Sequence, residues 1–99
     1  MYTTIRRYEG IEDTAEVARR AVAEFGPMLS DLPGFGGYWV VDAGDGVLAT
    51  ITVFETEEAA VESTSAAASW IRDNLPEIAS NTPQVTVGST AGVMAEAPA

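Results

Sequence analysis

Apolar residues follow two different periods in the first third of the chain. Residues 2–8 alternate loosely and are rich in Tyr, Thr and Ile, which predicts a short strand. From Val17 to Leu32 the apolar residues recur at helical spacing, behind an N-cap expected at Asp13. Gly26-Pro27 is expected to break or kink this helix, or to open a short second segment. The pattern predicts a strand and then an interrupted helix.

The middle of the chain has the pattern of a β-hairpin. Residues 35–41 and 47–54 are rich in β-branched and aromatic residues, and the Gly-rich turn at 42–46 joins them. Gly36-Gly37 is expected to form a bulge or a place of close backbone approach. Two strands joined by so short a loop should pair directly with each other.

A second helix and a last strand complete the pattern. Thr56 is expected to cap the helix, whose inward stripe consists of small residues with Trp70 as its bulky anchor. Residues 84–90 predict a strand that Gly88 interrupts and that could extend to Met94.

The order of elements, β-α-β-β-α-β, predicts a ferredoxin-like α+β fold. Right-handed crossovers place both helices on one face of a four-stranded antiparallel sheet, with the first and third strands central. If no bulge shifts the phase, Tyr38 and Val40 share one face of the sheet and Phe35, Trp39 and Val41 share the other. The face without helices is therefore apolar, which usually marks an interface. A two-fold homodimer, sheet against sheet, is the simplest way to cover it.

Composition removes several classes of function. A chain of 99 residues fits one domain, which we expect to span 1–94, with a flexible tail at 95–99. Without Cys or His, the chain has no disulfide, thiol nucleophile, thiolate zinc site or imidazole base, so we expect no metal and no cofactor. Fifteen acids against five basic residues give a net charge of −10, which argues against a nucleic-acid partner.

The negative charge is unevenly placed along the chain. Residues 1–20 are neutral in sum, so the whole net charge of −10 lies in residues 21–99. One interpretation is an acidic patch for a cationic partner; the other, which we favour, is a set of dispersed, solvated acids. The absence of Lys indicates a salt-rich cytoplasm, although a high-GC genome that prefers Arg would look similar.

Neither a membrane nor an export pathway is expected for this chain. No apolar stretch reaches the roughly 18 residues that a membrane span needs. The first residues do not combine a charged region with a following apolar run, as a signal peptide would. We therefore expect a cytoplasmic protein with no membrane partner.

Several segments resemble one protein superfamily. They are Ile5-Arg6-Arg7-Tyr8, Leu32-Pro33-Gly34-Phe35, the stretch from Tyr38 to Val47, Ile51-Thr52-Val53-Phe54-Glu55 with Ala59-Ala60 and Ser63, the Ala-rich helix around Trp70, and Val85-Thr86-Val87-Gly88. In these the chain resembles the dimeric α/β-barrel proteins, and among them small single-domain members related to antibiotic-biosynthesis monooxygenases. The resemblance spans most of residues 2–94.

The resemblance implies a dimeric α/β barrel, but it does not select one activity. The superfamily includes cofactor-free oxygenases, haem-degrading enzymes, isomerase-like and decarboxylase-like proteins and many members without an assigned reaction. Haem degradation there uses a His ligand, which this chain lacks, so we exclude it. Because a fold does not imply a function, the choice depends on the residues of the site.

Other motifs in the chain are better explained by structure than by chemistry. Asp42 and Asp45 flank a glycine turn, where acids usually form the turn and seldom bind a metal. Gly34-Phe35-Gly36-Gly37 precedes a strand and lacks the following Lys of a phosphate loop. The serines of the second helix have no His to act as a base, and the candidate general acids are Glu9, Glu55 and Glu62.

The most suggestive set of residues is Arg6, Tyr8, Tyr38, Trp39 and Trp70. Aromatic side chains from a strand and from the second helix could line a pocket between sheet and helices, with Arg6 or Arg7 as its positive tip. The alternative is that the two Trp lie in the core or the dimer interface.

This pattern gives three functional hypotheses and names no catalytic residue. The first is a homodimer that binds a small aromatic or acidic molecule in the pocket. The second is a cofactor-independent monooxygenase acting on a hydroquinone-like substrate, and the third is a structural or stress-related dimer without a ligand.

Overall fold

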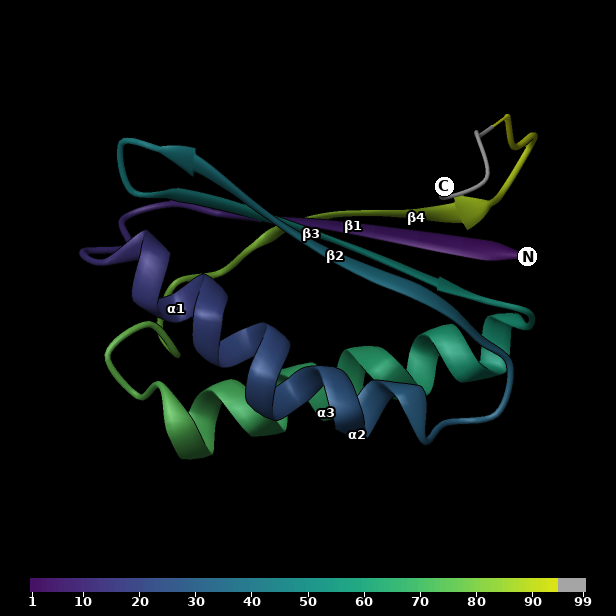
Figure 1. Ribbon diagram of the computed structural model, residues 1–99, viewed down its shortest axis with the longest axis horizontal. Helices are drawn as coiled ribbons and strands as arrows, with labels where there is room; N and C mark the ends of the chain where they lie inside the picture. The colour runs from purple at the N-terminus through teal and green to yellow at the C-terminus, as the bar shows by residue number, and fades with distance from the viewer. Residues whose placement is uncertain (95–99) are drawn as a thin grey trace.

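The structure, a computed structural model, describes residues 1–94 of the chain (Figure 1). Its elements are β1 (Tyr2–Tyr8), α1 (Thr14–Arg20), a π-helical turn η1 (Ala21–Phe25), α2 (Gly26–Ser30), β2 (Phe35–Gly44), β3 (Val47–Phe54), α3 (Glu57–Asn74) and β4 (Gln84–Ser89). The tail predicted at 95–99 lies outside the described residues. None of the described helices is long and apolar enough to cross a membrane.

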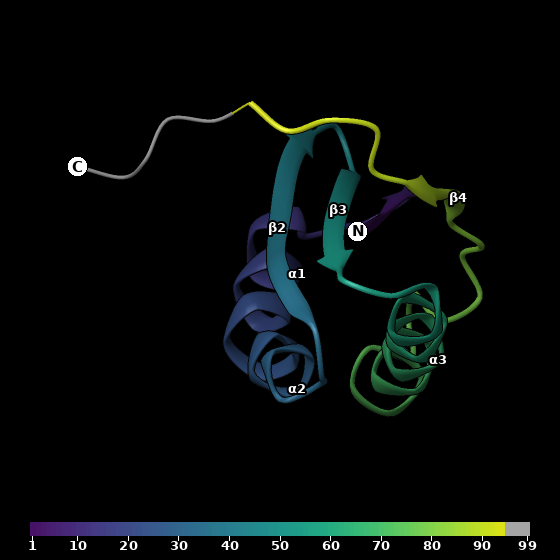
Figure 2. The same ribbon diagram turned by 90° about the vertical axis from the view of Figure 1, so that its right-hand side faces the viewer.

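The four strands form one antiparallel sheet in the order β2-β3-β1-β4. The helices lie together on one side of it, with α1 and α2 beneath β2 and α3 beside them, and the other side carries no helix (Figure 2). This is the ferredoxin-like βαββαβ arrangement predicted from the sequence, with the first and third strands in the centre.

Each central strand divides its side chains between the two faces of the sheet. On β1, Thr4, Arg6 and Tyr8 are buried beneath the helices, while Ile5 and Arg7 are exposed on the open face. β3 continues this division, because its even-numbered residues 48–54 are buried and its odd-numbered ones are only partly covered. The core therefore lies between the sheet and the helices.

A bulge near the start of β2 changes the predicted faces of that strand. The register between β2 and β3 shifts between Phe35 and Gly37, as the two glycines at 36 and 37 predicted. Phe35 consequently packs on the helix side against Phe54, with ring centroids 5.7 Å apart. Phe35 and Trp39 were expected on one face only in the absence of a bulge, and the bulge separates them.

The first helix continues through Gly26-Pro27 without the predicted break, and Pro27 opens the short segment α2, as the alternative prediction had it. Asp13 caps its start, because the carboxylate accepts a hydrogen bond of 3.1 Å from the amide of Glu16. At its centre the amide of Gly26 bonds the carbonyl of Ala21, five residues earlier, which is the π-helical pattern. Pro27 then lies in the first turn of α2, where its missing N–H has no helical partner to lose.

The π turn keeps a straight apolar stripe on this helix. Val17, Ala21, Phe25 and Leu29 all pack in or against the core at intervals of four residues. In an α-helix each step of four residues rotates about 40° around the axis, so such a stripe would drift away from the sheet. The wider π turn compensates for this drift and keeps Phe25 and Leu29 facing the sheet.

Helix α3 agrees closely with the helix predicted after Thr56. Thr56 caps it, since its hydroxyl accepts a hydrogen bond of 3.2 Å from the amide of Ala59. The buried residues of α3 are the predicted small ones and Trp70: Ala59, Ala60, Ser63, Ala67 and Trp70. Such a stripe lets the helix approach the sheet closely.

The last strand is an exposed edge. β4 pairs only with β1, runs without interruption through Gly88 and ends at Ser89, so the predicted extension to Met94 and the interruption were both wrong. Thr90 holds the end of β4 to the start of β1, because its amide donates to the carbonyl of Met1 at 2.8 Å.

Candidate functional site

A small cavity lies between the sheet and the helices. It is lined by Arg6, Tyr8, Val17, Ala21, Phe25, Tyr38, Val40, Leu48, Thr50, Ala67, Trp70, Ile71, Leu75 and Ile78. Its volume of about 40 Å³ is room for about three water molecules. A carboxylate or a phenolic oxygen fits this space, whereas a whole aromatic ring requires the surrounding side chains to move apart.

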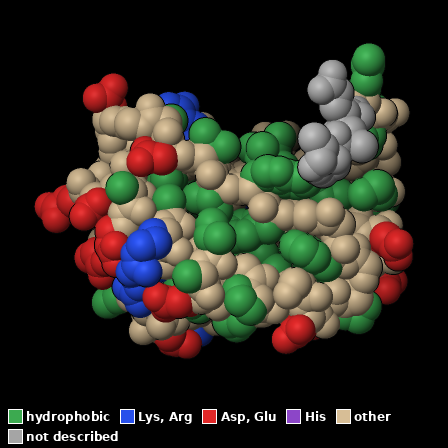
Figure 3. Space-filling view, viewed as in Figure 1, with side chains coloured by type: hydrophobic (Ala, Val, Ile, Leu, Met, Phe, Trp, Pro, Cys, Tyr) green, Lys and Arg blue, Asp and Glu red, His purple; other side chains and the backbone are tan. Residues whose placement is uncertain are grey.

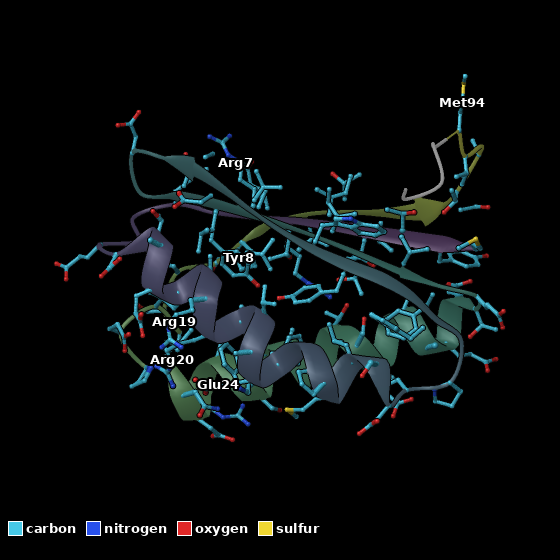
Figure 4. The ribbon with its side chains drawn as sticks, viewed as in Figure 1. Arg7, Tyr8, Arg19, Arg20, Glu24 and Met94 are labelled. Atoms are coloured by element: carbon cyan, nitrogen blue, oxygen red, sulfur yellow. The ribbon has the colours of Figure 1, made fainter. Side chains whose placement is uncertain are left out.

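Two residues of β1 bring polar groups to the cavity. Arg6 and Tyr8 lie two residues apart, so the strand directs both toward the helices. Arg7, between them, points to the open face, and Figure 4 shows Tyr8 and Arg7 on opposite sides of the sheet. Arg6 is only 4% exposed and Tyr8 is 9% exposed. The alternation of the strand thus answers which arginine faces the cavity.

Aromatic rings from three elements form one wall of the cavity. The ring of Phe25 stands edge-on to Tyr38 with centroids 6.0 Å apart, and its distance to the ring of Trp70 is 5.6 Å. Contacts of this kind stabilise a pair of rings beyond the burial of their area. The π turn is what aims Phe25 at both partners, so it shapes this wall.

Thr64, on helix α3, holds the side chain of Arg6 through a hydrogen bond. Arg6 Nη2 donates a hydrogen bond of 2.5 Å to Thr64 Oγ1. The same hydroxyl donates to the carbonyl of Ala60 at 3.2 Å, so its lone pairs remain for the guanidinium. This contact ties the centre of β1 to α3.

Burial sets the protonation states of the polar groups around the cavity. Burial raises the pKa of Tyr38 to about 12. The neighbouring Tyr8 raises this pKa further, and the positive charge of Arg6 lowers it. Burial also raises the pKa of Tyr8, and the positive charge of Arg6 again opposes this shift. It lowers the pKa of Arg6, which the two phenols raise. At neutral pH the cavity therefore contains one cation and two neutral hydroxyl donors.

Comparison with known proteins gives no match by sequence and clear matches by structure. No family model and no curated protein matches the chain. A protein of unknown function from Nitrosomonas europaea has a TM-score of 0.75 at 14% identity, over 98% of this chain and 95% of that one. SnoaB, a cofactor-independent oxygenase from Streptomyces nogalater, has a TM-score of 0.70 at 15% identity, over 96% and 97%.

A third match is a dimeric ferredoxin-like protein from an uncultured marine organism. Its TM-score is 0.64 at 8% identity, over 96% of this chain and 97% of that one. Further structures with the same fold are described as candidate antibiotic-biosynthesis monooxygenases. This chain has the ferredoxin-like fold that these proteins share. At such identities the likeness is one of fold, so it leaves the chemistry to the site.

Within this fold the structure brings together four of the five predicted site residues. Arg6, Tyr8, Tyr38 and Trp70 line the cavity. Trp39 does not, because it neighbours Tyr38 on the same strand and lies on the open face, where it is 53% exposed. Adjacent residues of a strand point to opposite faces, which already separates these two aromatics.

Sequence reasoning missed two contributors to the site. The helical spacing predicts Phe25 only as a core residue of the first helix, because its role in the cavity depends on the π turn. Thr64 gave no sequence signal, since a threonine on a helix next to several serines looks like a surface residue. The candidate acids Glu9, Glu55 and Glu62 are all exposed and none of them lines the cavity.

The acidic side chains of residues 1–94 all lie outside the cavity. Asp42 has a structural role, because its Oδ1 accepts a hydrogen bond of 3.0 Å from the amide of Gly44 at the irregular end of β2. The strand thus runs to Gly44, into the segment 42–46 that was expected to form the turn. Within that range no three acidic side chains gather as a metal site would require. In Figure 3 acidic side chains lie mainly toward the ends and lower edge of the molecule, and apolar ones gather in its middle.

Proposed function

We propose that this protein binds a small aromatic or acidic molecule in the cavity between its sheet and its helices. The observation that carries the proposal is the convergence of Arg6, Tyr8, Tyr38 and Trp70 on one apolar cavity. Apolar walls with a few convergent polar groups and shifted pKa values are typical of small-molecule sites. The walls would hold the body of the ligand, and the polar groups would orient it.

The two tryptophans provide a matched test of this proposal. Trp70 lines the cavity and Trp39 lies on the opposite face. In the Trp39→Phe variant, fluorescence reports on Trp70 alone, and we expect aromatic acids and phenols to change it in a saturable way. In the Trp70→Phe variant the remaining Trp39 should not respond. If no compound changes the Trp70 emission or raises the unfolding temperature, a dimer without a ligand becomes the better hypothesis.

A cofactor-independent monooxygenase is the second candidate function. Its support is the fold shared with SnoaB together with a buried cation beside two phenols, since such a cation can stabilise a substrate anion while oxygen reacts with it. Oxygen uptake with a panel of hydroquinones tests this candidate, with Arg6→Met as the inactive comparison. Binding without oxygen uptake across the panel would count against the oxygenase and leave the binding proposal intact.

The open face of the sheet is the proposed surface of a homodimer. Three large apolar residues are exposed there, Ile5 at 42%, Trp39 at 53% and Val41 at 44%, and the register aligns Ile5, Ile51 and Trp39 across three strands. Arg7 is the one charged residue that β1 to β4 direct to this face, and Glu9 lies 3.4 Å from it. In a chain of net charge −10, a face almost free of acids lets two copies meet without strong repulsion.

Paired charge substitutions test this interface. Trp39→Glu would place a carboxylate among the exposed apolar residues of the face, and Val22→Glu would place one on an equally exposed valine of the helix layer. Light scattering should show a dimer for the wild type and for Val22→Glu, and a monomer for Trp39→Glu. A wild-type monomer at working concentrations would overturn the dimer proposal. Because the cavity lies on the other side of the sheet, ligand binding is tested independently.

A further inference from the structure

The buried arginine has no counter-ion within the described part of the protein. Four of the five arginines, at positions 7, 19, 20 and 72, have a carboxylate within 4.0 Å, and their side chains lie at the surface. Arg6 is only 4% exposed, yet no carboxylate of residues 1–94 lies within that distance of it. Within residues 1–94, the one arginine at the cavity is therefore the one left without an acid.

This arrangement is costly unless an anion joins it. A guanidinium remains protonated at all physiological pH values, so it does not escape burial by releasing its proton. Charges removed from water are normally paired, and a single buried charge is strongly unfavourable. Within residues 1–94 the hydrogen-bond partner of the Arg6 guanidinium is Thr64 Oγ1, a neutral acceptor, which supplies no negative charge. The missing group is a negative charge at the cavity.

The surroundings of Arg6 fit a carboxylate in particular. The planar guanidinium matches the two oxygens of a carboxylate, and Tyr8 and Tyr38, which line the same cavity, carry hydroxyl groups that can donate hydrogen bonds to it. The cavity volume of about 40 Å³ accommodates such a group as it stands. Phe25 and Trp70 offer apolar contact to whatever the carboxylate is attached to.

We infer that the cavity selects anions, and that its ligand is a carboxylic acid bound in its ionised form to Arg6. This inference rests on the proposed binding function and narrows it to one chemical class. Neutral aromatics and amines are excluded as preferred ligands, because they leave the charge of Arg6 unmatched.

The test compares acids with neutral molecules of the same shape. Benzoate and benzamide, and acetate and acetamide, differ mainly in charge. We expect the wild-type protein to bind each acid at least about tenfold more tightly than its amide, measured by calorimetry and by Trp70 fluorescence in the Trp39→Phe variant. Arg6→Met should bring each acid and its amide to similar affinity, and Arg6→Lys should keep part of the preference. Arg7→Met, on the opposite face of the same strand, is the matched control and should leave the preference unchanged.

The outcomes separate this inference from the function on which it rests. Equal binding of benzoate and benzamide would overturn the anion preference and leave small-molecule binding intact, whereas binding of none of the four compounds would overturn both. A second measurement needs no ligand. Because Arg6→Met removes an uncompensated buried charge, its unfolding temperature should equal or exceed that of the wild type, and benzoate should no longer raise it. A marked fall without ligand would show that Arg6 is already compensated, which would overturn the inference.

Discussion

The indole ring of Trp39 lies over Gly37, two residues earlier on the same face of β2. A Cβ atom at position 37 would overlap the six-membered ring of the indole, with Cζ3 at 2.7 Å. The absent side chain of Gly37 therefore provides the space that the indole ring of this exposed residue occupies.

Gly37→Ala should weaken the proposed homodimer more than it weakens the fold. The added methyl group pushes the indole away from its position, and we expect association to lose about 1–3 kcal/mol. The stability of the monomer should change little, because an exposed ring can move. Gly88→Ala is the control, since it adds a methyl group at an open place on the same face. Sedimentation and urea unfolding measure the two effects, and equal loss of association in both variants would contradict this role of Gly37.

Thr52→Val should stabilise the protein. Thr52 is 1% exposed, and its hydroxyl has no hydrogen-bond partner among residues 1–94. Replacing an unpaired buried hydroxyl by a methyl group removes a desolvation cost, so we expect a gain of about 1 kcal/mol in the free energy of unfolding. Thr56→Val, which removes the N-cap of α3, should instead lose about 1 kcal/mol. A loss of stability in Thr52→Val would reveal a partner for its hydroxyl.

Stability should fall in alkaline solution because of Tyr38. Its pKa rises from 10.0 to about 12 on folding, so between these values the unfolded chain releases a proton that the folded protein keeps. The free energy of unfolding should therefore fall by about 1.4 kcal/mol per pH unit for this residue as the pH rises above about 10. Tyr8 contributes in the same direction, because burial raises its pKa as well.

Denaturant unfolding at several pH values, with tyrosinate absorbance recorded in parallel, measures this effect. In Tyr38→Phe the free energy of unfolding should fall less steeply with pH, by the amount that one tyrosine contributes. A decline of the same steepness in Tyr38→Phe would assign it to other groups.

Added salt should raise the thermal stability. The chain carries a net charge of −10, and the four ion pairs of residues 1–94 all lie at the surface, so general repulsion among the acids is the main long-range electrostatic effect. Molar KCl screens this repulsion, and a gain of about 1 kcal/mol would raise the unfolding temperature by roughly 4–8 °C. Sucrose, which screens no charge, is the control for general solute effects. An unfolding temperature that does not change between low and molar KCl would rule out salt adaptation.

Periodicity and turn chemistry predicted most of the fold because they are local. The strands at 2–8 and 47–54, and the cap residues Asp13 and Thr56, follow directly from the sequence. The course of the first helix does not, since a π turn adds one residue that an α-helical pattern does not count. The only sign of the π turn in the sequence is that Ala21, Phe25 and Leu29 follow one another at intervals of four residues.

The alternation of side chains along β1 predicts only the part of the candidate site that β1 contributes. Arg6 and Tyr8 must share a face whatever the rest of the fold does. The contact between Arg6 and Thr64 joins residues 58 positions apart, and no local pattern encodes it. The sequence suggests Trp39 for the site because it is aromatic and adjacent to Tyr38, but the pleat of the strand turns it to the other face.

The π turn gives the first helix an unusual tolerance to a change in length. If one of the exposed residues 22–24 were deleted, the segment could close as an ordinary α-helix. Phe25 and Leu29 would then follow Ala21 by three and seven residues, which is the usual spacing of one helix face, and both would still meet the sheet. A deletion in the middle of α3 has no such compensation and would rotate Trp70 by about 100° away from the cavity. The helix that closes the cavity thus carries a removable insertion, whereas its neighbour must keep its length.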